Sequence, residues 1–228
     1  TAAPFELSQV LTDYVTLTKP KVQLLLLLTT VTTMYVAGDP SAGLVALTVN
    51  PLAAALSLSG LLGYVFVYTL WLKRATPQNI VIGGAAGAVP PLVAWAAVTG
   101  GLSGTAFYLF AIVFFWTPPH FWALSLLMKD EYARAGVPML PVVRGEDETR
   151  RQILLYTILL YAVTQLPFCA GAFGVEYLVA SMALGGAFIY CAVRLLRSAD
   201  RRWALRTYLF SLAYLALLFL AMPLDRVV

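Results

Sequence analysis

The sequence predicts an all-α protein, a polytopic bundle of transmembrane helices, on the strength of three observations. Of the 228 residues, 61% are hydrophobic and only 11% are charged, a balance that a water-soluble domain of this size could not bury. Apolar stretches of about 20 residues, long enough to cross the hydrocarbon core of a bilayer, recur along most of the chain. These stretches lack the alternation of barrel strands, so helices remain as the way to satisfy the backbone in lipid.

Seven spans in a single transmembrane domain, residues 1–228, are expected. A segment of mixed polarity at residues 5–18 precedes the first span and is expected to lie on the membrane surface. It lacks the basic stretch and short apolar core of a cleavable signal peptide. The expected spans are residues 22–37, 51–72, 80–98, 104–128, 153–172, 175–193 and 203–222.

Two pairs of prolines fall inside these spans. Pro90 and Pro91 are expected to bend the third span. Pro118 and Pro119 are expected to interrupt and kink the fourth, because two consecutive prolines remove two backbone donors from the helix.

The distribution of positive charge predicts the orientation. With a cytoplasmic N-terminus, every Lys and Arg except Arg226 falls in a cytoplasmic segment, as the positive-inside rule requires. The net charge of +4 is therefore attributed to these loops rather than to a nucleic-acid partner. The cytoplasmic segments would be residues 1–21, 73–79, 129–151 and 194–206, which places the second and third of them on the same side of the membrane.

The first polar cluster follows the second span. Lys73 and Arg74 end the apolar run, and Thr76, Gln78 and Asn79 lead into the next one. Amides at the start of a helix, where free N–H groups favour anions, together with two cations predict a corner that binds diphosphate. The alternative is that the two cations only set the topology.

The second polar cluster follows the fourth span and contains Lys129, Asp130, Glu131 and Tyr132. Adjacent carboxylates at the membrane surface can hold Mg²⁺, which prefers oxygen ligands and bridges to substrate phosphates. The alternative is a solvated loop of mixed charge. The apolar tract after this cluster, residues 135–145 with two prolines, is expected to follow a fixed path. Its last residue but one, Arg144, is a further candidate for substrate binding.

His120 is the only histidine in the chain and lies directly after Pro118 and Pro119. An ionisable group within a transmembrane helix is a candidate functional residue. His120 could ligate haem iron, act as an acid or base, or hydrogen-bond a freed carbonyl group. The last three spans carry no charge in their middle, which argues against an ion-coupled transporter or a proton pump.

Four motifs together resemble a known family: Lys73-Arg74, the run TPQNIVIGGAAGA that begins at Thr76, WTPPHFWA from Trp116, and AGVPMLP from Ala135. With them the chain resembles, over residues ~15 to 225, the protohaem IX farnesyltransferase (haem O synthase) branch of the UbiA superfamily of intramembrane prenyltransferases. The resemblance implies an enzyme that joins farnesyl diphosphate to haem b, with haem b as a substrate and Mg²⁺ as cofactor. It implies haem O as the product, supplied to terminal oxidases, and a bundle that opens to the cytoplasmic side.

The resemblance also implies roles for individual residues. Lys73 and Arg74 would neutralise diphosphate, and Thr76, Gln78 and Asn79 would orient it. Asp130 and Glu131 would hold Mg²⁺ as the second acidic motif. The remaining substrate-binding candidates are Tyr68, Trp116, His120, Lys129, Tyr132 and Arg144. Of these, Tyr68 and Trp116 could shield an allylic cation or simply pack, and His120 could hold haem iron.

The chain departs from the family pattern in one place. The superfamily carries an acidic motif, N-xxx-D-xxx-D, near its second helix, and no such motif precedes Lys73 here. The family has nine spans and this chain has seven, so about two helices and their loop are expected to be missing between residues 43 and 51.

The expected setting is the bilayer of a bacterial plasma membrane, or of the mitochondrial inner membrane, with haem A synthase as a plausible partner. The alternatives are a UbiA-type enzyme acting on a quinone precursor or chlorophyllide, and a haem-binding membrane subunit or carrier without enzyme activity.

Overall fold

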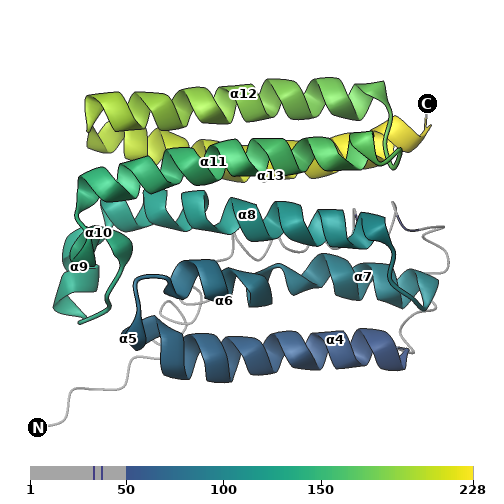
Figure 1. Cartoon of the computed structure of the whole chain (residues 1–228), viewed down its shortest axis with the longest axis horizontal. Coiled ribbons are helices and arrows are strands. Elements are labelled where there is room, and N and C mark those ends of the chain that lie inside the picture. The colour runs from purple at the N-terminus through teal and green to yellow at the C-terminus, as the bar shows by residue number, and fades with distance from the viewer. Residues whose placement is uncertain (1–32, 34–36, 38–49, 228) are drawn as a thin grey trace, which may run out of the picture.

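The computed structural model describes Thr33, Ala37 and residues 50–227, and in this part of the chain every regular element is a helix (Figure 1). The all-α prediction is therefore confirmed. The elements are α4 (Pro51–Leu62), the π-helix η1 (Gly63–Leu72), α5 (Lys73–Ala75), α6 (Asn79–Gly87), α7 (Val89–Thr99), α8 (Gly104–Leu127), α9 (Lys129–Arg134), α10 (Leu140–Val143), α11 (Glu146–Cys169), α12 (Val175–Ser198) and α13 (Arg201–Val227).

Six helical segments of the described chain are long and apolar enough to cross a membrane. They coincide with the last six expected spans, and the first, residues 22–37, lies outside the described residues. Polar segments separate the apolar runs, and this explains the agreement, because the length of an apolar run marks a transmembrane helix. The six segments are Pro51–Leu72, Asn79–Thr99, Gly104–Leu127, Glu146–Cys169, Val175–Ser198 and Arg201–Asp225.

The helices form layers with α8 in the middle (Figure 1). On one side α8 packs against α6 and α7, beyond which lies α4. On the other side it packs against α11 and α13, and α12 covers these two from outside. The short helices α5, α9 and α10 lie together at one end of the bundle (Figure 1). Loops 73–79 and 129–151 therefore share an end, as the charge pattern predicts.

The two proline pairs have different outcomes. The third span bends as expected: α6 ends at Gly87, and α7 begins at Val89 with Pro90 and Pro91 in its first turn, where a missing N–H costs nothing. The expected interruption of the fourth span is wrong, because α8 runs without a break through Pro118 and Pro119. Helices packed on both sides of α8 hold its path, which is how transmembrane helices tolerate proline.

The polar segment 129–151 is largely helical. The segment contains the whole of α9 and α10, and α11 already begins at Glu146. Glu146, Asp147 and Glu148 occupy the first turn of α11, where their carboxylates complement the positive end of the helix dipole. The fixed path expected for residues 135–145 is confirmed, because Met139 and Leu140 are buried in an apolar cluster.

Packing between α11 and α12 depends on a glycine. A Cβ atom at Gly185 would overlap the ring of Tyr161, whereas a Cβ at the neighbouring Gly186 would meet nothing. We expect Gly185→Ala to lower the free energy of unfolding by about 1–3 kcal/mol through overpacking. Gly186→Ala is the matched control, and we expect it to raise stability by roughly 0.5–1 kcal/mol through helix propensity. Thermal unfolding in detergent, followed by circular dichroism, measures both, and equal stability of the two variants would contradict the packing.

Candidate functional site

A cavity of about 330 Å³ at the loop end of the bundle brings the two polar loops together. We call it the Arg144 cavity. Its lining comes from four places: the turn after α5, the C-terminal part of α8, the α10 region, and the first turns of α11. The lining residues are Thr76, Pro77, Gln78, Trp122, Leu140, Arg144, Glu148 and Gln152.

The wall from the first loop is a tight turn. Thr76 leaves α5 in an extended conformation, and its hydroxyl oxygen accepts a hydrogen bond from the Gln78 N–H at 3.2 Å. The Thr76 carbonyl oxygen accepts a second bond from the Asn79 N–H at 3.2 Å. Asn79 is fully buried, and its side-chain amide donates to the Lys73 carbonyl oxygen at 3.4 Å. Asn79 therefore braces the turn, while Thr76 and Gln78 face the cavity.

The charges around this cavity favour an anion. Arg144 caps the C-terminal end of α10, is exposed, and forms no ion pair with the described residues. Glu148 is already engaged, because it accepts hydrogen bonds from Gln152 at 2.7 Å and from Arg151 at 3.4 Å. Lys73 is exposed beside the turn, and the side chain of Arg74 lies outside the described residues.

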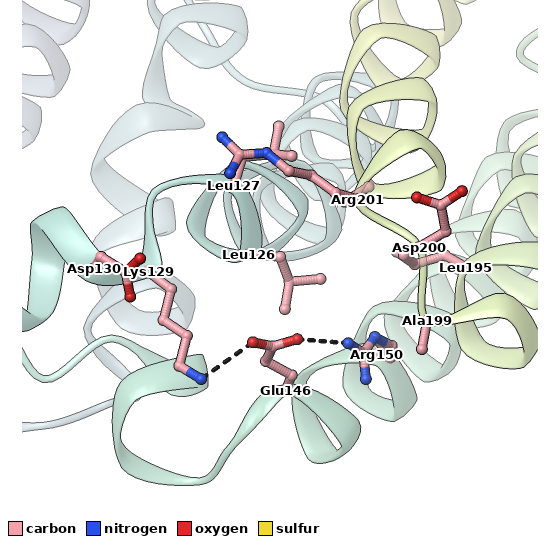
Figure 2. A pocket seen from close by; sticks show the side chains of 11 residues that line it. Leu126, Leu127, Lys129, Asp130, Glu146, Arg150, Leu195, Ala199, Asp200 and Arg201 are labelled. Carbon is pink, nitrogen blue, oxygen red and sulfur yellow. Dashed lines mark hydrogen bonds and ion pairs between the residues drawn. The ribbon is translucent and has the colours of Figure 1, made fainter.

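A second cavity of about 240 Å³ lies between α8, α9, α11 and the turn from α12 to α13 (Figure 2). Lys129 Nζ donates to Glu146 Oε1 at 3.1 Å, and Arg150 binds the other oxygen of Glu146 at 2.5 Å and Asp147 at 2.6 Å. Lys129 is thus part of an ion-pair network that ties α9 to α11. Its lining residues are Leu126, Leu127, Lys129, Asp130, Glu146, Arg150, Leu195, Ala199, Asp200, Arg201 and Ala204.

The structure separates the expected acidic residues from the amide turn. Asp130 lines the second cavity, Glu131 lines neither, and both are exposed. Tyr132 is half-buried; burial, and then the Glu131 carboxylate, raise the pKa of its phenol, so it stays a neutral donor.

Among the described residues no three metal-ligating side chains converge, and Glu148 is the single carboxylate in the lining of the Arg144 cavity. The described residues therefore do not by themselves form a Mg²⁺ site in the Arg144 cavity. Ligation of Mg²⁺ by Asp130 and Glu131 stays a prediction.

His120 and Trp116 lie inside the bundle, between α8 and α13, and line neither cavity. His120 Nδ1 shares a hydrogen bond of 2.7 Å with the Ser211 hydroxyl, and Trp116 Nε1 donates to the Ser211 carbonyl oxygen at 2.7 Å. The Trp116 and His120 rings stack with their centroids 4.3 Å apart, and Tyr208 packs on the imidazole at 4.9 Å. These contacts favour the structural interpretation of the histidine.

Tyr68 also lies apart from the two cavities. It projects from η1 and packs over Gly83 of α6, where a Cβ atom would overlap its ring. The π-helix ends at Leu72, and the N–H of the next residue, Lys73, donates a hydrogen bond to the Tyr68 carbonyl oxygen. Such segments often occur at functional sites.

Sequence reasoning missed five lining residues of the Arg144 cavity, and three of these carry polar groups in their side chains: Trp122, Glu148 and Gln152. Glu148 and Gln152 were overlooked because the start of α11 was expected seven residues later. The acidic run at 146–148 was the available signal, since it indicates a helix N-terminus and places residues four apart on one face. Trp122 lies in the motif WTPPHFWA, but nothing in the sequence indicates that it lines the same cavity as the first polar loop.

Comparisons with known proteins define the class of protein. A model of the UbiA prenyltransferase family matches residues 16–221, and the chain belongs to this family. With six helices of membrane-spanning length, it is an integral membrane protein. A solved structure of a digeranylgeranylglyceryl phosphate synthase matches with a TM-score of 0.68 and 18% identity, over 80% of this chain and 64% of that one. This likeness shows the fold.

Curated relatives narrow the class. A protoheme IX farnesyltransferase of Roseiflexus sp. (strain RS-1) is 45% identical over 282 residues, which cover 96% of this chain and 53% of the relative. The protoheme IX farnesyltransferase of Symbiobacterium thermophilum is 58% identical over 80% of this chain and 62% of its own length. That of Marinobacter nauticus is 57% identical over 79% and 60%. The chain thus spans between about half and two thirds of the length of these relatives.

Proposed function

We propose that this protein transfers a farnesyl group from farnesyl diphosphate to a vinyl group of haem b, which yields haem O and releases diphosphate. The names of relatives 45–58% identical over most of the chain support this proposal. The observation that carries it is the Arg144 cavity, which joins a hydroxyl, an amide and a guanidinium from two distant loops at one end of the bundle, and this guanidinium has no ion-pair partner among the described residues.

The chemistry requires charge stabilisation at the leaving group. As the allylic C–O bond breaks, negative charge grows on diphosphate, and preorganised cations and donors lower the energy of this transition state. Lys73, Arg144 and Gln78 are the described groups that could bind the diphosphate, and Arg74 follows Lys73 in the sequence as a further candidate. The allylic cation then adds to the haem vinyl group, and water completes the hydroxyethylfarnesyl substituent with loss of a proton. Tyr68 is the aromatic candidate for shielding the cation.

Mg²⁺ belongs to this proposal as well, because family members of this type are expected to bind diphosphate with it. Bound Mg²⁺ would neutralise the diphosphate charge. The carboxylates for it would be Asp130 and Glu131, completed by the acidic motif that this sequence lacks before Lys73.

We further propose that residues 1–228 form one domain from which the family's second and third helices are missing between Gly43 and Pro51. The alignment with the Roseiflexus relative supports this, because its 282 positions exceed the 228 residues of the chain. We expect the protein isolated from its native membrane to be several kDa heavier than the 24.8 kDa of this sequence. An intact mass of about 25 kDa would contradict the proposal that two helices are missing.

The proposed setting is a bacterial plasma membrane with the loop end facing the cytoplasm. The excess of Lys and Arg at that end supports the orientation, and the bacterial origin of the relatives supports the compartment. Haem A synthase is the proposed partner, because it would take up the released haem O.

A direct test is incubation of the purified protein with farnesyl diphosphate and haem b, followed by chromatography of the extracted haem. We expect a more hydrophobic haem that depends on both substrates. A protein that retains haem b in stoichiometric amount through purification and leaves it unmodified is instead a haem carrier, and that result would refute the proposal.

A further inference from the structure

Two arginines from neighbouring helices stack on one indole ring at the surface of the bundle. The guanidinium carbon of Arg194, near the end of α12, lies 4.7 Å from the centroid of the Trp203 ring, and that of Arg206 on α13 lies 4.8 Å from it. The Arg194 guanidinium also donates a hydrogen bond of 3.2 Å to the Tyr190 hydroxyl oxygen. Aromatic contacts rather than carboxylates therefore hold both cations in place. We call Tyr190, Arg194, Trp203 and Arg206 the arginine–tryptophan cluster.

The two cations of this cluster are not neutralised. Arg194 and Arg206 are exposed, and neither forms an ion pair with any residue that the structure describes. The acidic residue closest to them in sequence, Asp200, accepts a hydrogen bond of 2.9 Å from the Arg202 backbone N–H. Two like charges beside one ring repel each other, and a bound anion offsets this repulsion. The cluster therefore favours an anionic ligand.

The cluster lies where the apolar parts of α12 and α13 end. Residues 177–193 of α12 carry no charge, and Arg194 is the first charged residue after them. Arg206 is the last charged residue before residues 207–224 of α13, which carry none. Figure 1 shows α12 on the outside of the bundle, and its turn into α13 at the end that carries α9 and α10. Arginine beside tryptophan and tyrosine at this position is typical of the interface between membrane and water.

Exposed apolar side chains continue from the cluster toward the middle of the membrane. Tyr190 and Met182 precede Arg194 on α12 at multiples of four residues, and they are 54% and 50% exposed. Leu209 follows Arg206 by three residues and is 48% exposed. Residues three or four apart share one face of a helix, so an apolar surface adjoins the two cations. Cations above an apolar surface fit a lipid, whose acyl chains cover that surface, better than they fit a free anion.

We propose that the arginine–tryptophan cluster binds the phosphate group of an anionic phospholipid from the leaflet at the loop end. The guanidinium groups of Arg194 and Arg206 donate to the phosphate oxygens, since a planar guanidinium presents several N–H groups to such an anion. Trp203 is a positioning residue that orients the two cations. None of the four residues lines the Arg144 cavity or the second cavity, so this inference does not depend on the proposed function.

The test is selective binding of phosphatidylglycerol over phosphatidylcholine, measured by native mass spectrometry of the purified protein as each lipid is titrated. We expect the wild type to bind one phosphatidylglycerol at least about tenfold more tightly than phosphatidylcholine. In the double variant Arg194→Gln/Arg206→Gln, we expect the affinity for phosphatidylglycerol to fall at least about tenfold, because both phosphate contacts are lost. The affinity for phosphatidylcholine is expected to stay the same.

Arg197→Gln/Arg202→Gln is the matched control. Both residues are exposed arginines near the same turn, so this variant loses the same two charges at the same end of the bundle. Neither of them stacks on Trp203 within the described structure. We expect its affinity for phosphatidylglycerol to stay within about twofold of the wild type, because salt screens exposed charges that do not touch the phosphate.

Two further variants test the role of the indole ring. Trp203→Leu keeps both cations and removes the ring that orients them, and we expect phosphatidylglycerol to bind about three- to fivefold more weakly. Trp203→Phe keeps an aromatic face and is expected to restore most of the affinity. Equal affinity of these two variants would refute the positioning role.

Equal loss of phosphatidylglycerol affinity in the two double variants would overturn the proposal, since diffuse positive charge would then account for the binding. Equal affinity of the wild type for the two lipids would overturn it as well. A second titration adds excess inorganic phosphate, which we expect to leave the lipid bound; displacement would show that the cluster binds free phosphate instead. Should Arg194→Gln/Arg206→Gln not fold, the single variants Arg206→Gln and Arg202→Gln provide the same comparison.

Discussion

Lys73→Ala is expected to lower the rate of haem O formation at least about tenfold, because a contact between a cation and an anionic oxygen contributes about 1.5–3 kcal/mol. Lys73 is exposed at the start of α5, and Asn79 holds its carbonyl oxygen, which fixes the backbone from which the ammonium group projects. The measurement is the initial rate with saturating haem b and varied farnesyl diphosphate.

Arg197→Ala provides the control for charge alone. Arg197 is an exposed cation in the last turn of α12 and lines neither cavity, so its removal changes the net charge equally. We expect this variant to keep the wild-type rate. A Lys73→Ala protein that forms haem O as fast as the wild type would show that Lys73 only sets the topology.

Arg150→Met is expected to produce the largest loss of stability among the charged residues, about 2 kcal/mol. The side chain of Arg150 is 9% exposed and binds Glu146 and Asp147, so its removal leaves carboxylates without their main cation. Breaking a fully buried ion pair costs about 3–5 kcal/mol, and the partial exposure of Glu146 reduces this figure. Thermal or denaturant unfolding in detergent provides the measurement.

The adjacent Arg151 is a matched control, because its side chain is 70% exposed and contacts Glu148 at 3.4 Å. We expect Arg151→Met to change stability by less than about 1 kcal/mol, as is usual for surface ion pairs. If both variants lose the same stability, the network shown in Figure 2 does not hold α11 as described.

Hydropathy could predict the spans but not the path of each helix. Apolar run length placed the six described spans correctly, because the bilayer thickness fixes how long a helix must be. The continuity of α8 through Pro118 and Pro119 depends on helices packed on both sides, which no local pattern contains. The early start of α11 at Glu146 was hidden because a charged first turn resembles a loop.

The candidate site was predictable in part. The charge asymmetry placed the two loops at one end, and Thr76, Gln78 and Arg144 do line a common cavity. Proximity in sequence gave no means of telling that Asp130 belongs to a second cavity, or that Asn79 turns inward to brace the loop. That Trp122 belongs to the lining of this cavity could only be learned from the structure.

The identity of the prenyl acceptor is the central claim, and competition between acceptors tests it most directly. The protein is incubated with isotopically labelled farnesyl diphosphate, haem b and an aromatic quinone precursor in one reaction, and label is measured in each acceptor. We predict that the label enters haem and that none enters the quinone precursor. Label in the quinone precursor, with haem b recovered unchanged, would contradict the account.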